Sequence, residues 1–241
     1  MKNNWYTIYK FAHRGLHNSK FAENTLEAFE NAINHGFGIE LDVRLTKDNQ
    51  VVVFHDDNTS RLCGENKKVI DLTLENLRSL KINNKHTIPT LQEVLDLVQD
   101  RVPIIIEMKN IKGVKNHSEL IYNTIKNYTG RIAVKSFNPR LIAWFTKHAP
   151  HITRGILASK FNDTKLPFYQ KFILKNLLYI KKVNPHFISY CYGDMPSKYL
   201  KHIDIPLLLW TIRNKDEEEK ALKLANSIIF ENYIPQTAFN K

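Results

Sequence analysis

Short apolar runs alternate with longer amphipathic segments along most of the chain. Near-continuous apolar runs separated by helical stretches are typical of a parallel sheet buried on both faces. The strand-like runs lie at residues 9–14, 38–43, 103–108, 131–137, 154–158, 187–191, 207–212 and 227–231. The helix-like segments lie at residues 25–35, 91–98, 118–128, 139–148 and 216–225. Eight strands that alternate with helices close a (β/α)₈ barrel, so the pattern predicts an α/β chain with a TIM-barrel fold.

Two of the predicted helices have recognisable starts. Asn24 can cap the first helix, because Glu27 follows at the third position after it, as in a capping box. Asp216 precedes an acidic first turn, which suits the positive end of a helix dipole. A competing architecture, the open doubly wound sheet, is disfavoured because no G-x-G-x-x-G sequence follows a predicted strand.

One further apolar run, at residues 51–55, predicts the return arm of a hairpin. A two-residue turn at Asp48-Asn49 would place His55 opposite Asp42. Directly opposed residues share one face of the ladder, with Cβ atoms roughly 4.5–5.5 Å apart. A longer loop would shift this register.

The stretch from about residue 56 to residue 88 has weaker strand character and carries a helix in LTLENLRSL. It predicts a small insertion after the second strand. No repeat, linker or low-complexity stretch argues for a second unit, so we expect a single domain over residues 1–241.

Charge is the unusual property of the composition, with a net charge of +11 and a pI near 9.5. A basic surface attracts anions, including nucleic acid, anionic lipid and phosphodiesters. The lysines are scattered, and no RNP, KH or zinc-finger pattern is present, so a nucleic-acid partner is not expected. No obligate protein partner is evident either.

The sequence contains no stretch of about 18 apolar residues and no apolar signal core near its start. Cys63 and Cys191 are too few for a disulfide framework. We therefore expect a cytoplasmic protein with two unpaired thiols.

Paired carboxylates stand on the second predicted strand. Glu40 and Asp42 project from one face, roughly 6–7 Å apart along the strand. Buried carboxylates are costly without a cation or arginines, and oxygen ligands select Mg²⁺ or Ca²⁺ over zinc. The alternative, an exposed acidic pair on an edge strand, is disfavoured by the apolar residues that flank them. The pattern predicts a divalent-cation site.

Glu107 and Lys109 repeat the same spacing at the end of the next barrel strand. Glu107 could complete the carboxylates around the cation, and Lys109 could reach a substrate phosphate. A simple solvent-facing Glu/Lys pair is the open alternative.

His13 and Arg14 end the first apolar run, where barrel enzymes collect catalytic side chains. Arg14 offers the planar fork that suits phosphate oxygens. Together with His55, His13 supplies two imidazoles that can share acid and base duties near neutral pH.

These motifs closely resemble the signature of the glycerophosphodiester phosphodiesterase family. The matching segments are HRG at 13–15, ENT at 23–25 with AF at 28–29, E-x-D-V at 40–43 and HD at 55–56, followed by IPTLQEVLDLV, IEMK, VKSFNPRLI and LLLWTI. The resemblance implies a TIM barrel and one divalent cation. It implies metal ligands Glu40, Asp42 and Glu107, catalytic His13 and His55, and phosphate contacts Arg14 and Lys109. The implied reaction is hydrolysis of a glycerophosphodiester, a small-molecule substrate, to glycerol 3-phosphate and an alcohol.

The chain departs from the family pattern at three positions, where Lys135, Arg213 and Glu231 replace the usual residues. We expect these positions to lie across the barrel mouth from the carboxylates and to affect the choice of alcohol. Trp210 could line the substrate pocket or belong to the barrel core.

Two other functions are compatible with the sequence. The first is lysophospholipase D-like action on bulkier lipid esters, which a longer apolar groove at the barrel mouth would favour. The second is a non-catalytic barrel that binds anionic surfaces, and the complete set of histidines and carboxylates argues against it. Residues 166–183 predict a basic amphipathic helix. We favour packing of its apolar stripe on the barrel over peripheral contact with a membrane.

Overall fold

The computed structural model of the protein describes residues 4–110, 116–162 and 165–236. Eight parallel strands close into a barrel, because β1 pairs with β2 on one side and with β11 on the other. The barrel strands are β1 (Phe11–His13), β2 (Gly38–Leu45), β6 (Ile104–Met108), β7 (Ile132–Ser136), β8 (Thr153–Ala158), β9 (Phe187–Cys191), β10 (Leu207–Ile212) and β11 (Ser227–Phe230). They are the eight predicted strands, so the TIM-barrel prediction is confirmed.

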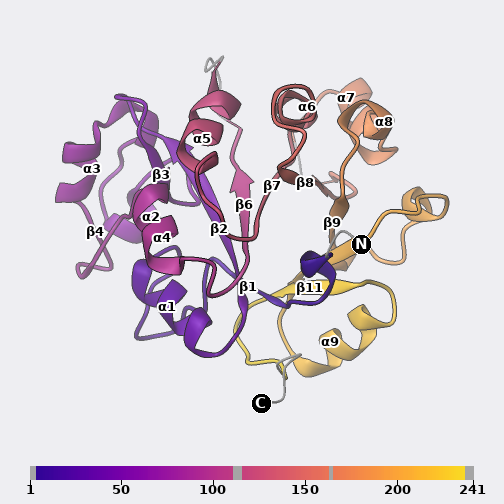
Figure 1. Cartoon of the computed structure of the whole chain (residues 1–241), viewed down its shortest axis with the longest axis horizontal. Helices are drawn as coiled ribbons and strands as arrows, with labels where there is room; N and C mark the ends of the chain where they lie inside the picture. Colours follow the sequence, from indigo (N-terminus) through magenta and orange to yellow (C-terminus); the bar gives the residue numbers. More distant parts are fainter. Residues whose placement is uncertain (1–3, 111–115, 163–164, 237–241) are drawn as a thin grey trace.

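Helices surround the strands on the outside of the barrel (Figure 1). They are α1 (Leu26–Asn34), α4 (Leu91–Val98), α5 (His117–Ile125), α6 (Pro139–His148), α7 (Phe168–Lys175), α8 (Ile180–Val183) and α9 (Lys215–Leu222). Local sequence sets several of their starts. Thr90 and Glu93 form a capping box at α4, and Asn138 caps α6 directly before Pro139.

Two predicted helix starts are wrong by one or two residues. The cap of α1 is Thr25, whose side chain accepts a hydrogen bond from the Ala28 amide, and the cap of α9 is Asn214. Asn24 cannot serve as the cap because its backbone is left-handed, at φ 55°, whereas a capping residue is usually extended. Its amide side chain is thereby free to turn toward the barrel.

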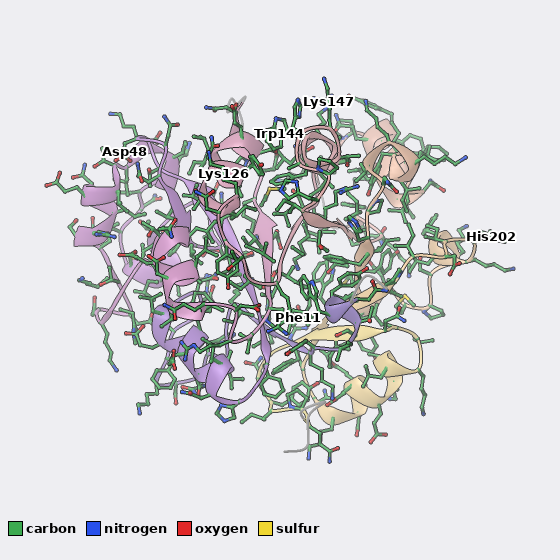
Figure 2. All side chains as sticks on the ribbon, viewed as in Figure 1. Phe11, Asp48, Lys126, Trp144, Lys147 and His202 are labelled. Atoms are coloured by element: carbon green, nitrogen blue, oxygen red, sulfur yellow. The ribbon has the colours of Figure 1, made fainter. Side chains whose placement is uncertain are left out.

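Aromatic and aliphatic side chains fill the amino-terminal end of the barrel. Phe11, Ile105, Ala133, Phe187, Leu208 and Ile229 form one buried cluster with Trp5 and Tyr6 of the 3₁₀ helix η1 (Trp5–Thr7). Gly155 makes room for this packing, since a Cβ there would lie 2.3 Å from the ring of Phe187. Figure 2 shows Phe11 near the centre of the molecule, with Lys147 at its upper edge. The polar side chains at the carboxyl-terminal end of the barrel therefore lie above a buried apolar layer.

The predicted hairpin and insertion follow β2. Strand β3 (Val51–Val53) runs antiparallel to β2. The insertion has its own apolar cluster, centred on Val52, Phe54, Leu77 and Ile82. It comprises α2 (Ser60–Cys63), η2 (Val69–Asp71), α3 (Leu74–Ser79), β4 (Lys81–Ile82) and β5 (His86–Thr87). Two further 3₁₀ helices, η3 (Tyr192–Asp194) and η4 (Lys198–Leu200), precede β10. A single domain over residues 1–241 stays a prediction.

The segment 166–183 differs from its prediction. It forms two short helices, α7 and α8, separated by the left-handed Leu177 at φ 52°. No residue of α7 is buried, and Phe168 and Phe172 are 84% and 52% exposed. The interpretation of this segment as a barrel helix that packs its apolar stripe on the sheet is therefore wrong for α7. None of the helices among the described residues is both long and apolar enough to cross a membrane.

Candidate active site

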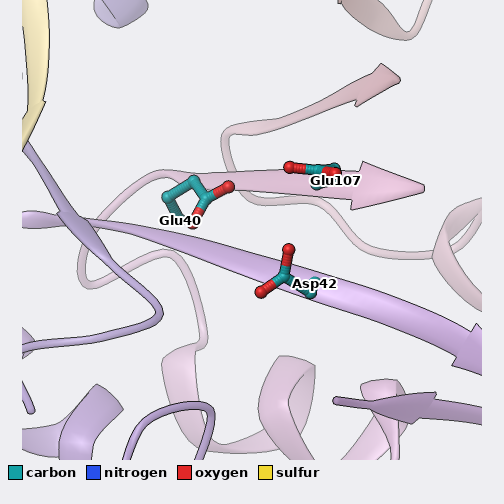
Figure 3. A group of neighbouring side chains, drawn as sticks. All are labelled: Glu40, Asp42 and Glu107. Atoms are coloured by element: carbon teal, nitrogen blue, oxygen red, sulfur yellow. The ribbon is translucent and has the colours of Figure 1, made fainter. Parts of the chain in front are cut away.

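Three carboxylates meet inside the barrel, as their spacing predicted. Glu40 and Asp42 alternate with the outward apolar residues of β2, and the strand register sets Asp42 beside Glu107 of β6. All three residues are buried, and one carboxylate oxygen from each lies within 4.8 Å of the other two. Figure 3 shows the three groups directed toward one another. The open alternative of a solvent-facing Glu107 is excluded by this burial.

Lysine ammonium groups compensate the carboxylates. Lys109 Nζ lies 2.8 Å from Asp42 Oδ1 and 2.6 Å from Glu107 Oε1. Lys135 Nζ lies 2.9 Å from Glu40 Oε1. Burial opposes the charged form of Lys109, but Asp42 and Glu107 outweigh it and raise the pKa of the ammonium. Burial alone would raise the pKa of Glu40, but the ammonium of Lys135 and the charge of His13 together outweigh it, and the pKa is lowered. The surroundings therefore favour the charged forms of Glu40, Asp42 and Lys109.

The donor set of the cluster fits a divalent cation. Glu40 Oε1 and Asp42 Oδ1 are buried, and the lysines that approach them are not aligned for a hydrogen bond. Each oxygen therefore keeps a lone pair. Together with Glu107, these two carboxylates form an all-oxygen set of the kind that hard cations such as Mg²⁺ and Ca²⁺ prefer.

Arg14 joins the cluster from the turn after β1. Its backbone N–H donates to Glu40 Oε2 at 3.3 Å, and its Nε lies 3.5 Å from Asp42 Oδ2. Glu23 holds the other end of the guanidinium at 2.7 Å. Asn24 donates its side-chain amide to Asp42 Oδ2 at 2.9 Å. The segment before α1 therefore orients Asp42 from the loop side.

His13 lies beside Glu40 in the strand register, and its ring contacts a further carboxylate, that of Glu231. Its Nδ1 is 2.7 Å from Glu231 Oε2, and Arg213 Nη2 lies 2.9 Å from the other oxygen of that carboxylate. The hydrogen bond from His13 is the main cause that lowers the pKa of Glu231 to about 2, against burial. Glu231 is therefore charged at every pH at which a histidine titrates, and it favours an Nδ1–H tautomer of His13.

The observed register between β2 and β3 differs from the one that was predicted to place His55 opposite Asp42. Val43 pairs with Val53, and the Phe54 amide donates to the Asp42 carbonyl, so Phe54 stands opposite Asp42. The loop is longer than predicted because it spans residues 47–49, with Asn49 left-handed at φ 61°. His55 follows the end of β3.

His55 nevertheless lies close to the carboxylates. Burial would raise the pKa of Asp42, but the charges of Lys109, His55 and Arg14 together outweigh it and lower that pKa. The ring of His55 is 2.7 Å from Asp56 through Nδ1 and is 32% exposed, about twice the value for His13. Both imidazoles thus have Nδ1 bound to a carboxylate, so each keeps Nε2 for another partner.

Aromatic side chains form the opposite part of the mouth. Trp210 faces the barrel interior two residues after Leu208, and its Nε1 is buried with no hydrogen-bond partner among the described residues. Its ring meets Phe137 edge-on at 5.8 Å, and Phe137 meets Phe161 in the same way at 5.8 Å. Trp210 is only half-buried, so it lines the mouth instead of closing the core.

The three departures from the family pattern were expected to lie across the mouth from the carboxylates, and this expectation is wrong. Lys135 pairs directly with Glu40, while Arg213 and Glu231 support His13. Asn24, interpreted as a helix cap, instead holds Asp42. The only sequence signal for Lys135 was a lysine inside a strongly apolar run, which needs a buried anion as partner.

The chain is similar to known proteins of one family. The model of the glycerophosphoryl diester phosphodiesterase family matches residues 13–234. A glycerophosphodiester phosphodiesterase from Caldanaerobacter subterraneus is 31% identical over 254 aligned positions, which cover 95% of each chain. One from Bacillus altitudinis is 38% identical over 160 positions, which cover 61% of this chain and 65% of that enzyme.

Solved structures agree with this result. A Thermotoga maritima glycerophosphodiester phosphodiesterase superimposes with a TM-score of 0.73 at 27% identity, covering 92% of this chain and 93% of that one. An Oleispira antarctica phosphodiesterase, solved in complex with the product sn-glycerol-3-phosphate, gives a TM-score of 0.78 at 21% identity and covers 93% and 94% of the two chains. The predicted family resemblance and the predicted enzyme class are both confirmed.

Proposed function

Because the chain belongs to the glycerophosphoryl diester phosphodiesterase family, we propose that it hydrolyses glycerophosphodiesters to glycerol 3-phosphate and an alcohol. The observation that carries this proposal is the buried group of Glu40, Asp42 and Glu107 beside two histidines. The complex of the Oleispira antarctica enzyme with glycerol 3-phosphate supports the same small-molecule substrate class.

Glu40, Asp42 and Glu107 would hold one divalent cation, Mg²⁺ or Ca²⁺. When bound, such a cation polarises a phosphoryl oxygen and offsets the charge that develops there. Lys109 and Arg14 lie at the edge of the same cluster and carry the positive charge that a phosphodiester needs. In this proposal their free donors bind the phosphate of the substrate.

His13 and His55 divide the proton transfers. One imidazole accepts the proton of the attacking oxygen, and the other gives a proton to the oxygen of the leaving alcohol. Both rings present Nε2 because Nδ1 is bound to Glu231 or to Asp56. These carboxylates hold the rings in orientation and favour the imidazolium form that arises during turnover.

The test is release of glycerol 3-phosphate from glycerophosphocholine and glycerophosphoethanolamine by the purified protein. We expect turnover that EDTA abolishes and that Mg²⁺ or Ca²⁺ restores. Turnover that survives complete chelation would overturn the cation role. Absence of turnover with either cation would overturn the activity itself.

We further propose that the outer face of α7 makes peripheral contact with an anionic membrane. Phe168 and Phe172 are exposed on this helix, Leu178 is exposed shortly after it, and lysines accompany them. A variant with Glu at Lys171, Lys175, Lys181 and Lys182 should lose co-sedimentation with anionic vesicles at low salt. Matched substitutions at the exposed Lys67, Lys68, Lys81 and Lys85 give the same charge change and should retain it. Equal sedimentation of the two variants would remove α7 from membrane binding.

The cytoplasm remains the proposed compartment. Cys63 and Cys191 are free thiols, as a reducing compartment keeps them. Burial raises the pKa of the Cys63 thiol to about 11, so it carries little thiolate and is poorly reactive.

A further inference from the structure

A network of ion pairs joins the insertion to the residues around the carboxylate cluster. Arg61, on α2 of the insertion, contacts two carboxylates that come from different segments of the chain. Its Nε donates to Asp56 Oδ2 at 2.7 Å, while Nη1 and Nη2 donate to the two oxygens of Glu23 at 2.9 and 2.7 Å. All the nitrogens of one planar guanidinium are thus engaged, in a geometry that a lysine cannot reproduce.

Each of these two carboxylates also holds a residue of the proposed mechanism. Asp56 Oδ1 lies 2.7 Å from Nδ1 of His55. Glu23 Oε1 accepts from Nη1 of Arg14 at 2.7 Å, and the same oxygen accepts from Nη2 of Arg61. Arg61 therefore lies at the middle of a continuous chain of contacts that runs from the imidazole of His55 to the guanidinium of Arg14.

The charge of Arg61 keeps both carboxylates ionised. Burial would raise the pKa of Asp56, but the hydrogen bonds and charges of Arg61 and His55 outweigh it and lower that pKa. Burial would likewise raise the pKa of Glu23, but Arg61 and Arg14 outweigh it and lower that pKa as well. An ionised carboxylate only accepts hydrogen bonds, so each can hold the N–H of its catalytic-site partner in one direction.

The main chain on both sides of this network is fixed without Arg61. Arg44 donates Nε and Nη2 to the carbonyl of His55 at 2.9 and 2.8 Å. Leu62 anchors α2, because it is buried in the apolar cluster of the insertion. Removal of the Arg61 side chain should therefore leave the backbone in place and release only the ring of His55 and the guanidinium of Arg14.

We propose that Arg61 is a positioning residue, which orients His55 through Asp56 and Arg14 through Glu23. The inference rests on the proposed hydrolysis, in which His55 transfers a proton and Arg14 binds the phosphate. A small misplacement of such groups can cost up to about 10²-fold in rate. Arg61 itself is half-exposed, and exposed ion pairs contribute little to folding, so its effect should appear in catalysis and not in stability.

The test separates kcat from KM for glycerophosphocholine. Arg61→Ala should lower kcat by about tenfold, because the ring of His55 loses its orientation, and should raise KM by about threefold, because Arg14 does. The two carboxylates should divide this effect. Asp56→Asn should lower kcat with KM nearly unchanged, and Glu23→Gln should raise KM with kcat nearly unchanged. A general loss of structure would not separate the two constants in this way.

Arg78→Ala is the matched control. Arg78 lies on α3 of the same insertion and pairs with Glu93 at 2.6 Å, and its side chain is 44% exposed, against 48% for Arg61. This variant should keep the wild-type kcat and KM. Guanidinium ion should restore part of the activity of Arg61→Ala, whereas sodium chloride at the same ionic strength should not. Arg61→Lys should stay impaired, because one ammonium does not replace the planar fork.

Circular dichroism and thermal melting should show that every variant is folded. Wild-type kcat and KM in Arg61→Ala would overturn the inference. Equal losses in Arg61→Ala and Arg78→Ala would also overturn it, as would equal recovery with guanidinium and with sodium chloride. Absence of turnover by the wild type would instead overturn the proposed hydrolysis, so the two failures are distinct.

Discussion

The two sides of the barrel mouth differ in what fills them. On the side of β1, β2 and β6 the inward side chains are charged, and each charge has a partner within salt-bridge distance. On the side of β10 and the loop after β7 they are aromatic, and the row from Trp210 to Phe161 leads into an open groove. The first side can stabilise charge on a phosphodiester, and the second offers mostly apolar surface together with the indole N–H of Trp210.

The two sides should therefore differ in how much a substitution costs in free energy. Removing one member of a buried ion cluster leaves its partners unpaired, at a cost of about 3–5 kcal/mol. Replacing one aromatic side chain at an open groove leaves no charge uncompensated. We therefore expect changes on the charged side to remove the chemistry, and changes on the aromatic side to alter only which substrate binds well.

The largest effect should come from the carboxylates. Glu40→Ala, Asp42→Ala and Glu107→Ala should each lower kcat/KM on glycerophosphocholine by about 10³-fold or more, because a bound cation supplies several kcal/mol of transition-state stabilisation. Asp42→Asn and Glu107→Gln are the controls that preserve size. Circular dichroism should show folded protein in each case. Near-native rates in these variants would end the cation assignment.

Substitution of the histidines should have the second-largest effect on activity. His13→Ala and His55→Ala should each reduce the rate by about 10²-fold or more, the usual scale for a lost general acid or base. The wild-type profile of kcat/KM against pH should be bell-shaped, because the two imidazoles work in opposite protonation states. A variant that lacks one imidazole but keeps its rate would take that residue out of the mechanism.

Glu231 should matter less than His13 itself, because it acts through His13. Its pKa is lowered to about 2, so it is charged across the whole working range and contributes no limb of its own to the pH profile. Glu231→Gln should lower kcat about tenfold and move the limb that depends on His13 to lower pH, since a negative charge no longer favours the imidazolium. An unshifted profile would make Glu231 a purely structural residue.

The same ion pair also affects stability. Because the folded-state pKa of Glu231 is depressed from an ordinary value of 4.5 to about 2, its contribution is complete above about pH 4.5 and is lost as the pH falls toward 2. In acid titrations, the stabilities of wild type and Glu231→Gln should therefore differ by a constant amount above about pH 4.5 and converge as the pH falls toward 2. Parallel curves over the whole range would show that the pair contributes nothing to folding.

The smallest effect on the chemistry should come from the aromatic side. Trp210→Phe should raise KM for glycerophosphocholine by about threefold, with kcat nearly unchanged, since it removes a donor that contributes to binding in both ground and transition states. Steady-state kinetics separate the two constants. A large fall in kcat with unchanged KM would show that Trp210 takes part in the chemical step. That result would contradict the division of the mouth into a charged side and an aromatic side.

The sequence was most informative where periodicity alone decides the geometry. Alternation within β2 put Glu40 and Asp42 on the inner face, and the apolar run at β6 identified the strand that carries Glu107. These features depend on neighbours in sequence and on the order of strands in a barrel. They could therefore be predicted from the chain.

Partners that are far apart in sequence could not be predicted. Glu231 meets His13 across 218 positions, and nothing local to either residue indicates the other. The hairpin register depended on one additional loop residue, which moved Phe54 into the place expected for His55. The exposure of α7 depended on how little of the helix the barrel covers, which amphipathic periodicity does not report.

Cation binding by the metal-free protein is the most direct test of the charged side. Isothermal titration of chelator-treated wild type with Ca²⁺ and with Mg²⁺ should show one site per chain, and Glu107→Gln should weaken it by about tenfold or more. The same substitution should lower glycerol 3-phosphate release under limiting cation and recover part of it at high cation. Absence of binding to wild type, or equal binding by wild type and Glu107→Gln, would contradict the account.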